Sequence, residues 1–203
     1  MTSSLSLVSE HPEIAPLLGE RVQRAKVVQA MVDVVAEKGY ATATVADAVR
    51  RARVSRGTFY ELFTSKEACL AAGHRLGTEA LERRISDAVR GAADWREELR
   101  LGIRAYLAAL DGDVNFARVY LLEAPAVASE HEAGLRRFAG RYGKSFPRSG
   151  EPVPPDDALF VLAAGVHELA CARLRAGLPV TDLEETLTGC AVRFVTKEEP
   201  PWT

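Results

Sequence analysis

The sequence predicts an all-α fold, and three observations support this prediction. Apolar residues recur at helical spacing; Val27, Met31, Val34 and Val35, for example, fall at i, i+4, i+7 and i+8. Capping and breaking residues follow one another closely enough to leave no room for strands between the helices. No alternating run of Val, Ile or Thr is long enough for a sheet.

The first predicted helices are short and closely spaced. Residues 1–20 contain prolines and a glycine without a sustained helical period, so we expect a tail there. Gly39 ends the first helix, as glycine commonly does. The next three helices start after the N-cap candidates Thr44, Ser55 and Ser65. The predicted helices cover residues 21–38, 45–51, 56–63 and 66–89. Residues 21–66 are therefore expected to form one small helical domain.

Residues 67–203 are predicted to form a larger helical domain. Asp94 can cap its first new helix, and the run Asp111-Gly112-Asp113 breaks that helix. Residues 143–157 hold four prolines and two glycines, so we expect a loop there. The further predicted helices cover residues 95–110, 114–123, 125–142, 156–176 and 182–195.

The composition favours a globular protein without a membrane span. Of the 203 residues, 47% are hydrophobic and 27% are charged, and charged residues interrupt every apolar stretch. The first 20 residues lack the basic segment of a secretory signal. Cys69, Cys171 and Cys190 are widely spaced and odd in number. We therefore expect reduced thiols in a cytoplasmic protein rather than a disulfide framework.

The sequence does not predict an enzyme. It lacks a GxSxG elbow, a P-loop, an HExxH pair and a dinucleotide-binding fingerprint, and no paired catalytic groups stand at suggestive spacing. We expect no catalytic residues and no cofactor. His167 and Cys171 stand at i and i+4, as a metal-binding pair would, but no third ligand can be identified. A metal site is therefore not predicted.

The net charge of −2 conceals an uneven distribution. Residues 21–66 contain nine Lys or Arg and four Asp or Glu, a net charge of +5, so the rest of the chain carries −7. Clustered basic residues on a small helical domain are typical of phosphate binding. An Arg-rich but merely solvated helix surface is the alternative, and charge alone does not decide between them.

The segment from Thr44 to Glu67 carries the most specific pattern in the chain. It reads TVADAVRRARVSRGTFYELFTSKE, two short helices with a tight turn between them and then the start of a longer helix. Such a pair lets the second helix enter a major groove while the first lies across the DNA backbone. The expected core residues are Val45, Ala48, Val49, Phe59 and Phe63. The exposed face of the second helix then presents Arg56, Thr58 and Tyr60.

This segment resembles the DNA-binding domain of the TetR family, the tetracycline-repressor-like regulators. The matching motifs are Lys38-Gly39-Tyr40, Thr44-Val45, Val54-Ser55-Arg56-Gly57-Thr58-Phe59-Tyr60, Phe63 and Ser65-Lys66-Glu67. Their order and spacing are far more specific than a lone helix-turn-helix pattern. The resemblance implies an N-terminal helix-turn-helix domain of three helices, followed by a larger helical domain for effector binding and dimerisation.

Two positions depart from the family pattern. Arg53 stands where the turn between the two helices usually has a glycine. If the turn keeps a left-handed residue, a non-glycine side chain there costs on the order of 1 kcal/mol. Leu62 stands where the family often has a histidine after the tyrosine, so we expect one polar DNA contact to be missing.

The resemblance and the helix caps together define the candidate DNA-binding residues, which are Thr44, Arg53, Ser55, Arg56, Gly57, Thr58, Tyr60 and Lys66. Thr44 and Ser55 are also ordinary helix caps. Arg56 is the candidate for base recognition because Arg can bridge two guanine acceptors, although a contact to phosphate alone is nearly as well supported. Lys66 is unfavourably placed for the helix dipole, and a phosphate partner would explain its position.

The last two predicted helices, 156–176 and 182–195, are the expected homodimer interface. A short recognition helix reads few base pairs, so we expect a symmetric dimer on palindromic DNA half-sites about 34–36 Å apart. The resemblance places the interface in these two helices. Small residues that would permit close approach there are Ala163, Ala164, Gly165 and Ala170. Packing within one chain is the alternative for part of each apolar stripe.

Aromatic and polar-tipped residues in the second domain are candidates for a small-molecule cavity. They are Tyr106, Phe116, Tyr120, Phe138 and His167. Ordinary core packing is the alternative for each of them. The leading hypothesis is a sequence-specific transcriptional regulator, a repressor that an effector releases from its operator. The alternative is a DNA-binding interaction or architectural protein whose second domain binds a protein partner.

Overall fold

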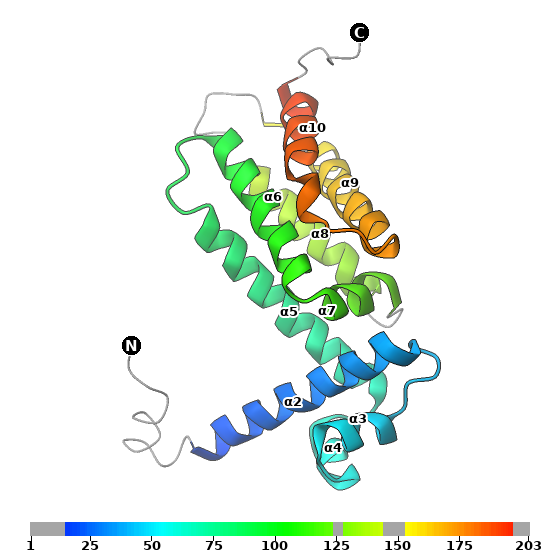
Figure 1. Cartoon of the computed structure of the whole chain (residues 1–203). Coiled ribbons are helices and arrows are strands. Elements are labelled where there is room, and N and C mark those ends of the chain that lie inside the picture. Colours follow the sequence, from blue (N-terminus) through cyan, green and yellow to red (C-terminus); the bar gives the residue numbers. More distant parts are fainter. Residues whose placement is uncertain (1–14, 124–127, 144–152, 197–203) are drawn as a thin grey trace. The chain divides into compact units, whose positions relative to one another are not determined.

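The computed structural model describes residues 15–123, 128–143 and 153–196, and every regular element in these ranges is a helix (Figure 1). The all-α prediction is confirmed. The chain divides into two compact units, residues 1–73 and residues 74–203. The division falls inside helix α5 (Lys66–Ala88), which continues from the first unit into the second. The predicted domain boundary after residue 66 coincides with the start of this helix, whereas the compact unit extends to Gly73.

The first unit contains α2 (Ala15–Lys38), α3 (Val45–Ala52) and α4 (Arg56–Leu62). Helix α2 begins earlier than expected, because the sequence pattern assigns residues 15–20 to a tail. Proline is tolerated in the first turn of a helix, where its missing N–H has no helical acceptor, and Pro16 lies there. Residues 1–14 of the predicted tail lie outside the described part of the chain.

The short helices α3 and α4 begin at the predicted N-caps. Thr44 Oγ1 accepts a hydrogen bond from the Asp47 N–H at 3.2 Å, and Ser55 Oγ accepts one from the Thr58 N–H at 2.9 Å. Between the two helices, Arg53 has φ 54° and ψ 47°, the left-handed conformation that the missing glycine usually adopts. Of the expected core residues of this unit, four are buried, namely Ala48, Val49, Phe59 and Phe63, while Val45 is half-buried.

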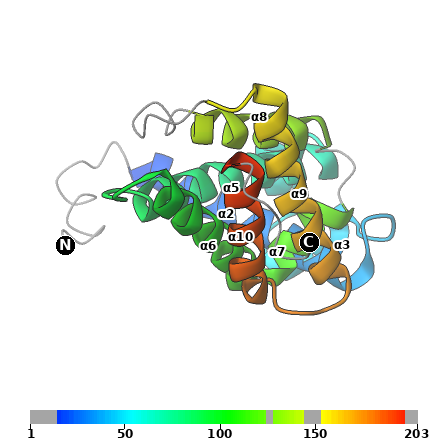
Figure 2. The same cartoon turned by 90° about the horizontal axis from the view of Figure 1, so that it is seen from above.

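The second unit is built on four long helices, which are the second half of α5, α6 (Trp95–Gly112), α8 (Ala128–Gly143) and α9 (Asp156–Arg175). Shorter elements complete it: α7 (Val114–Arg118), the π-helical turn η2 (Val119–Glu123), the 3₁₀ turn η5 (Thr181–Leu183) and α10 (Glu184–Thr196). Helix α8 packs beside α9, and α10 packs beside α6 (Figure 2). No helix of the described residues has the length and apolar character needed to cross a membrane.

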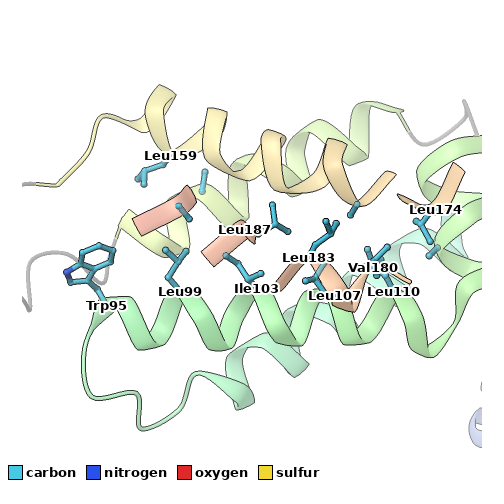
Figure 3. Close-up of a cluster of buried hydrophobic side chains, with 14 residues drawn as sticks. Trp95, Leu99, Ile103, Leu107, Leu110, Leu159, Leu174, Val180, Leu183 and Leu187 are labelled. Carbon is cyan, nitrogen blue, oxygen red and sulfur yellow. The ribbon is translucent and has the colours of Figure 1, made fainter. Parts of the chain in front are cut away.

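The main core of the second unit lies between α6, α9 and α10. Trp95, Leu99, Ile103, Leu107 and Leu110 follow one side of α6 and point toward the other two helices (Figure 3). They pack with buried residues that include Leu159, Leu174, Val180, Leu183 and Leu187. This spacing along α6 is that of one continuous apolar face, so the hydrophobic effect holds these helices together.

Helix α6 runs further than predicted, through Asp111 to Gly112. The Asp111 carboxylate accepts hydrogen bonds from the N–H of Val180 at 3.2 Å and from the Thr181 hydroxyl at 2.7 Å. The residue that the sequence marks as a helix breaker therefore holds the chain before α10 against the last turn of α6.

Candidate nucleic-acid interface and ligand cavity

Some of the basic residues of the first unit form ion pairs with carboxylates of the same unit. The Asp47 carboxylate pairs with Lys38 at 2.8 Å and with Arg50 at 2.6 Å, and Glu37 pairs with Arg51 at 2.6 Å. The hydrogen bond from Lys38, together with that from the Thr44 hydroxyl, holds the pKa of Asp47 well below its ordinary value. Lys38, Arg50 and Arg51 thus have carboxylate partners within their own domain.

Arg53 and Arg56 differ from these paired cations. Both side chains are exposed, and neither makes a hydrogen bond or ion pair with any residue that the structure describes. Arg53 occupies the left-handed turn, and Arg56 is the first residue of α4. Two unpaired positive charges therefore flank Ser55, at the start of the predicted recognition helix. Such charges suit contacts to the acceptor groups of DNA.

The structure places most of the other candidate DNA-binding residues on the surface of the same segment. Thr44, Ser55, Gly57 and Tyr60 are exposed, and the exposed fraction of Tyr60 is 52%. Thr58 is half-buried, and its hydroxyl shares a hydrogen bond with the Ser55 hydroxyl at 2.9 Å. The Tyr60 ring meets the buried Phe59 ring edge-on, with centroids 5.4 Å apart. The hydroxyl end of Tyr60 is therefore carried on a ring that the core helps to orient.

Lys66 has intramolecular contacts that its sequence position does not predict. Its Nζ donates hydrogen bonds to the Tyr40 carbonyl at 2.7 Å and the Ala43 carbonyl at 3.1 Å, and it lies 4.1 Å from the centroid of the Tyr40 ring. These contacts tie the first turn of α5 to the loop between α2 and α3. They account for a cation at this helix start without a phosphate, so the phosphate contact of Lys66 stays a prediction.

Arg24 is a residue of this unit that sequence reasoning missed. Its guanidinium donates a hydrogen bond to the Leu62 carbonyl at 2.9 Å and lies 4.3 Å from the centroid of the Phe63 ring. Arg24 thereby satisfies a carbonyl at the C-terminal end of α4 and anchors that helix to α2. No local motif predicts this role, because Arg24 is far from its partners in sequence. From the sequence alone it is one basic residue among several in the domain.

The second unit contains a cavity of about 280 Å³. It is lined by residues of α5 to α9, and most of them are apolar. All five residues predicted for a ligand cavity lie in its wall, namely Tyr106, Phe116, Tyr120, Phe138 and His167. Sequence reasoning missed the contribution of α5, which supplies His74, Gly77, Thr78, Ala80, Leu81, Arg84 and Ile85. The spacing of these residues indicates one helix face, but only packing shows that the face lines a cavity.

Close packing shapes one wall of this cavity. A Cβ atom on Gly77 would lie 2.2 Å from Cζ of Phe116, closer than real atoms approach one another. The Phe116 ring therefore rests directly on the backbone of α5, and its centroid is 4.3 Å from that of Tyr120. Glycine at position 77 is needed for this arrangement because any side chain would displace the ring.

The cavity has few charged groups. The Asp113 carboxylate accepts a hydrogen bond from the Phe116 N–H at 3.0 Å, so it serves as the cap of α7. Arg84 is exposed and forms no ion pair or hydrogen bond with the described residues. An apolar cavity with an unpaired cation in its wall suits an amphiphilic anion.

Polar contacts join α6 and α9 in the cavity wall. The Tyr106 hydroxyl and His167 Nδ1 are 3.1 Å apart, and His167 Nε2 is 3.2 Å from Cys171 Sγ. Burial raises the pKa of the Tyr106 phenol above its ordinary value and that of the Cys171 thiol to about 11. His167 and Cys171 do approach each other, but no group of three potential metal ligands occurs among the described residues.

The helices and the exposed surface of the first unit are those of a helix-turn-helix DNA-binding domain. Residues 27–72 match the model of the bacterial regulatory proteins of the tetR family. This segment of the chain is therefore a DNA-binding domain of the tetR type. The resemblance stated from the motifs is thereby confirmed, as is the prediction of a helix-turn-helix domain followed by a larger helical domain.

The chain is similar to one curated bacterial regulator and to two solved regulator structures. The fatty acid metabolism regulator protein of Bacillus subtilis is 31% identical over 104 residues, 51% of this chain and 54% of that protein. The chain thus spans about half the length of this curated relative. The fatty acid degradation regulator FadR from Bacillus halodurans has a similar fold, with a TM-score of 0.71, 20% identity and coverage of 85% of this chain and 94% of that chain. FadR from Bacillus subtilis, solved in complex with stearoyl-CoA, has a TM-score of 0.72, 21% identity and coverage of 86% and 99%.

Proposed function

We propose that the chain is a transcriptional repressor that binds a palindromic operator as a homodimer and releases it when an acyl ligand enters the cavity. The apolar cavity of about 280 Å³, in a chain that carries a TetR-family DNA-binding domain, is the observation that carries this proposal. The DNA contacts, the homodimer and the ligand class each rest on further features of the two units.

The DNA-binding role is assigned to the surface around Arg53 and Arg56. Arg56 reads a base in the major groove, since a bidentate contact to guanine is the commonest specific contact of Arg. Arg53, Tyr60 and the hydroxyls of Thr44 and Ser55 contact phosphate oxygens, and Gly57 leaves room for the DNA backbone. The two unpaired arginines support this assignment because their charges have no protein partner among the described residues.

The homodimer is assigned to α9 and α10. Val161, Leu169 and Phe194 are large apolar side chains of these helices with exposed fractions of 56%, 38% and 48%. Gly165 lies midway between Val161 and Leu169 at four-residue spacing and is also exposed, so another helix can approach α9 closely there. Burying this stripe against a second copy would remove apolar surface from water. Of the small residues named from the sequence, Ala170 instead belongs to the core and Ala163 lines the cavity.

The effector is assigned to the class of fatty acyl compounds. The cavity wall is largely apolar, and Arg84 offers an unpaired cation for a carboxylate or phosphate head group. The similarity to the fatty acid metabolism regulator of Bacillus subtilis supports the same class. Such a ligand releases DNA only if it binds the released state more tightly than the DNA-bound state. Helix α5 belongs to both units. Lys66 and the cavity-lining residues of α5 therefore lie on one helix.

The experiment combines a DNA selection with ligand release. The purified chain selects from random double-stranded DNA, and fluorescence anisotropy then measures affinity for the selected site between low and high salt. We expect a palindromic site, a steep loss of affinity with salt and release by one or more acyl-CoA thioesters in a chain-length series from octanoyl to stearoyl.

Control variants separate the parts of this proposal. Replacing both Arg53 and Arg56 with alanine should abolish specific binding, whereas Arg90→Ala, which removes an exposed arginine of the second unit, should not. Selection of no sequence would contradict the repressor. Tight operator binding that no acyl-CoA or free fatty acid weakens would contradict the acyl effector while leaving the DNA-binding role intact.

A further inference from the structure

The side chains of Tyr106, His167 and Cys171 form a hydrogen-bonded chain in the largely apolar wall between α6 and α9. Tyr106 Oη lies 3.1 Å from His167 Nδ1, and His167 Nε2 lies 3.2 Å from Cys171 Sγ. Tyr106 and His167 line the cavity, whereas Cys171 is buried behind them with an exposed fraction of 1%. Their neighbours in the wall are apolar and include Ile103, Leu162, Ala163 and Val166.

The Tyr106 hydroxyl can form more hydrogen bonds than it forms with the described residues. A phenol offers one donor and two acceptor positions, and the contact to His167 uses one of them. If His167 Nδ1 carries the proton, the Tyr106 hydrogen is available to the cavity. If Nδ1 accepts, both remaining Tyr106 positions are acceptors. In either tautomer, Tyr106 can bind one more hydroxyl group, because a hydroxyl both donates and accepts.

The surroundings keep this hydroxyl neutral and fixed in place. Burial raises the pKa of Tyr106, since the phenolate would be desolvated, so the phenol stays protonated at neutral pH. The thiol of Cys171 is held protonated for the same reason, with its pKa raised to about 11. His167 is therefore held between two neutral groups and orients the Tyr106 hydroxyl. A plain hydrocarbon chain against this hydroxyl would remove from water the hydrogen-bonding positions that His167 does not use, without giving them a partner.

We propose that Tyr106, positioned by His167, is a specificity-determining residue that selects effectors bearing a hydroxyl group on the acyl chain. This inference rests on the proposed acyl effector and names a narrower class within it. Cys171 supports the arrangement from behind by hydrogen bonding to the far side of the imidazole. An effector of this class fills the apolar cavity with its chain and forms a hydrogen bond between its own hydroxyl and that of Tyr106.

The test is a hydroxyl scan along one fatty acid. Isothermal titration calorimetry on the full chain measures the affinity for decanoic acid and for hydroxydecanoic acids with the hydroxyl at successive carbons. One position should bind about threefold to tenfold more tightly than decanoic acid, the range expected for one net hydrogen bond. Tyr106→Phe should abolish this preference while changing the affinity for decanoic acid little, because the two side chains have nearly the same shape.

Two further variants distinguish recognition from a general loss of structure. Tyr142 is a second tyrosine of the cavity wall whose hydroxyl forms no hydrogen bond with the described residues, so Tyr142→Phe should keep the preferred position. His167→Leu should lose the preference, and His167→Gln, which retains a hydrogen-bonding side chain, should restore part of it.

The possible outcomes separate this inference from the proposed function. A wild-type chain that binds decanoic acid and all its hydroxy derivatives equally would overturn the role of Tyr106 and leave the acyl effector standing. The same holds if Tyr106→Phe keeps the preferred position. Failure of every acid to bind would overturn this inference, whereas the acyl effector itself is overturned only if no acyl-CoA releases the operator either.

Discussion

Lys66 Nζ lies 4.1 Å from the centroid of the Tyr40 ring and donates a hydrogen bond to the Tyr40 carbonyl at 2.7 Å. A second hydrogen bond, to the Ala43 carbonyl, completes the contact. One lysine thus satisfies two backbone carbonyls in the loop before α3 and fixes that loop to the start of α5. The N-terminal ends of α3 and α5 are held together by this contact in the DNA-binding unit.

Lys66→Met should destabilise the DNA-binding unit, because two carbonyls lose a charged donor. We expect the free energy of unfolding to fall by about 1–3 kcal/mol, measured by urea denaturation. Lys26→Met, which removes an exposed lysine of α2, should change it by less than about 0.5 kcal/mol. An unchanged stability of Lys66→Met would contradict the structural role. The salt dependence of DNA binding is measured for the same variant. If it is lower than that of the wild type by the equivalent of about one phosphate contact, Lys66 also contacts phosphate, as the sequence predicts.

Arg53→Gly should stabilise the chain. Arg53 is the only non-glycine residue with a positive φ in the described ranges, and this conformation costs a side-chain-bearing residue on the order of 1 kcal/mol. Thermal denaturation should show a higher melting temperature for Arg53→Gly but not for Arg53→Ala, which keeps the strain. Both variants should weaken DNA binding and lower its salt dependence if Arg53 contacts phosphate. A gain of stability in Arg53→Ala would show that charge, not backbone strain, is the cause.

Acid should weaken the DNA-binding unit through Asp47. Hydrogen bonds from Lys38 and Thr44 lower the pKa of Asp47 in the folded state below that of an unfolded Asp, which is about 3.9. The stabilisation is therefore complete above the unfolded-state pKa and is lost as the pH falls through the lower folded-state pKa. Unfolding measured between pH 7 and pH 2 should be less pH-dependent in Asp47→Asn than in the wild type. Asp33→Asn, which removes a carboxylate of α2 that has no part in these contacts, should keep the wild-type profile.

Gly77→Ala should close part of the ligand cavity. The added methyl group would lie 2.2 Å from Phe116 Cζ, so the ring must move. We expect acyl-ligand affinity to fall at least tenfold, measured by calorimetry, while the circular dichroism spectrum stays helical. Gly140→Ala is the matched control, because a Cβ there meets nothing within 4 Å. It should keep ligand affinity and raise stability by up to about 1 kcal/mol, as Ala in place of Gly does in a helix. Unchanged affinity in Gly77→Ala would place the ligand elsewhere.

Arg56→Ala should relax sequence preference at one base pair of each half-site. A bidentate contact to guanine is worth about 1–3 kcal/mol of discrimination, so a repeated DNA selection should lose that position while keeping the others. Tyr60→Phe, which removes a hydroxyl assigned to phosphate, should weaken binding to all sequences alike. A uniform loss in Arg56→Ala would mean that Arg56 contacts phosphate only.

The sequence determined the elements whose causes are local. Thr44 and Ser55 cap the helices for which they are the predicted N-caps, and Arg53 adopts the left-handed turn because the turn requires that conformation of whichever residue occupies it. Capping, turn geometry and helical periodicity act over a few neighbouring residues. The helix-turn-helix unit and the all-α class could therefore be predicted from the amino-acid sequence alone.

Only the tertiary structure decided which apolar and charged groups have partners. The large apolar residues of α9 recur at helical spacing but have three different surroundings: Leu159 and Leu174 are in the core, Leu162 and Val166 line the cavity, and Leu169 is exposed. Lys66, Arg53 and Arg56 are all cations near α4. The structure shows that Lys66 donates hydrogen bonds to backbone carbonyls, whereas the side chains of Arg53 and Arg56 form none with the described residues. Periodicity shows which residues share a helix face, but what that face meets depends on helices far away in sequence. Burial, ion pairing and cavity shape follow from that packing.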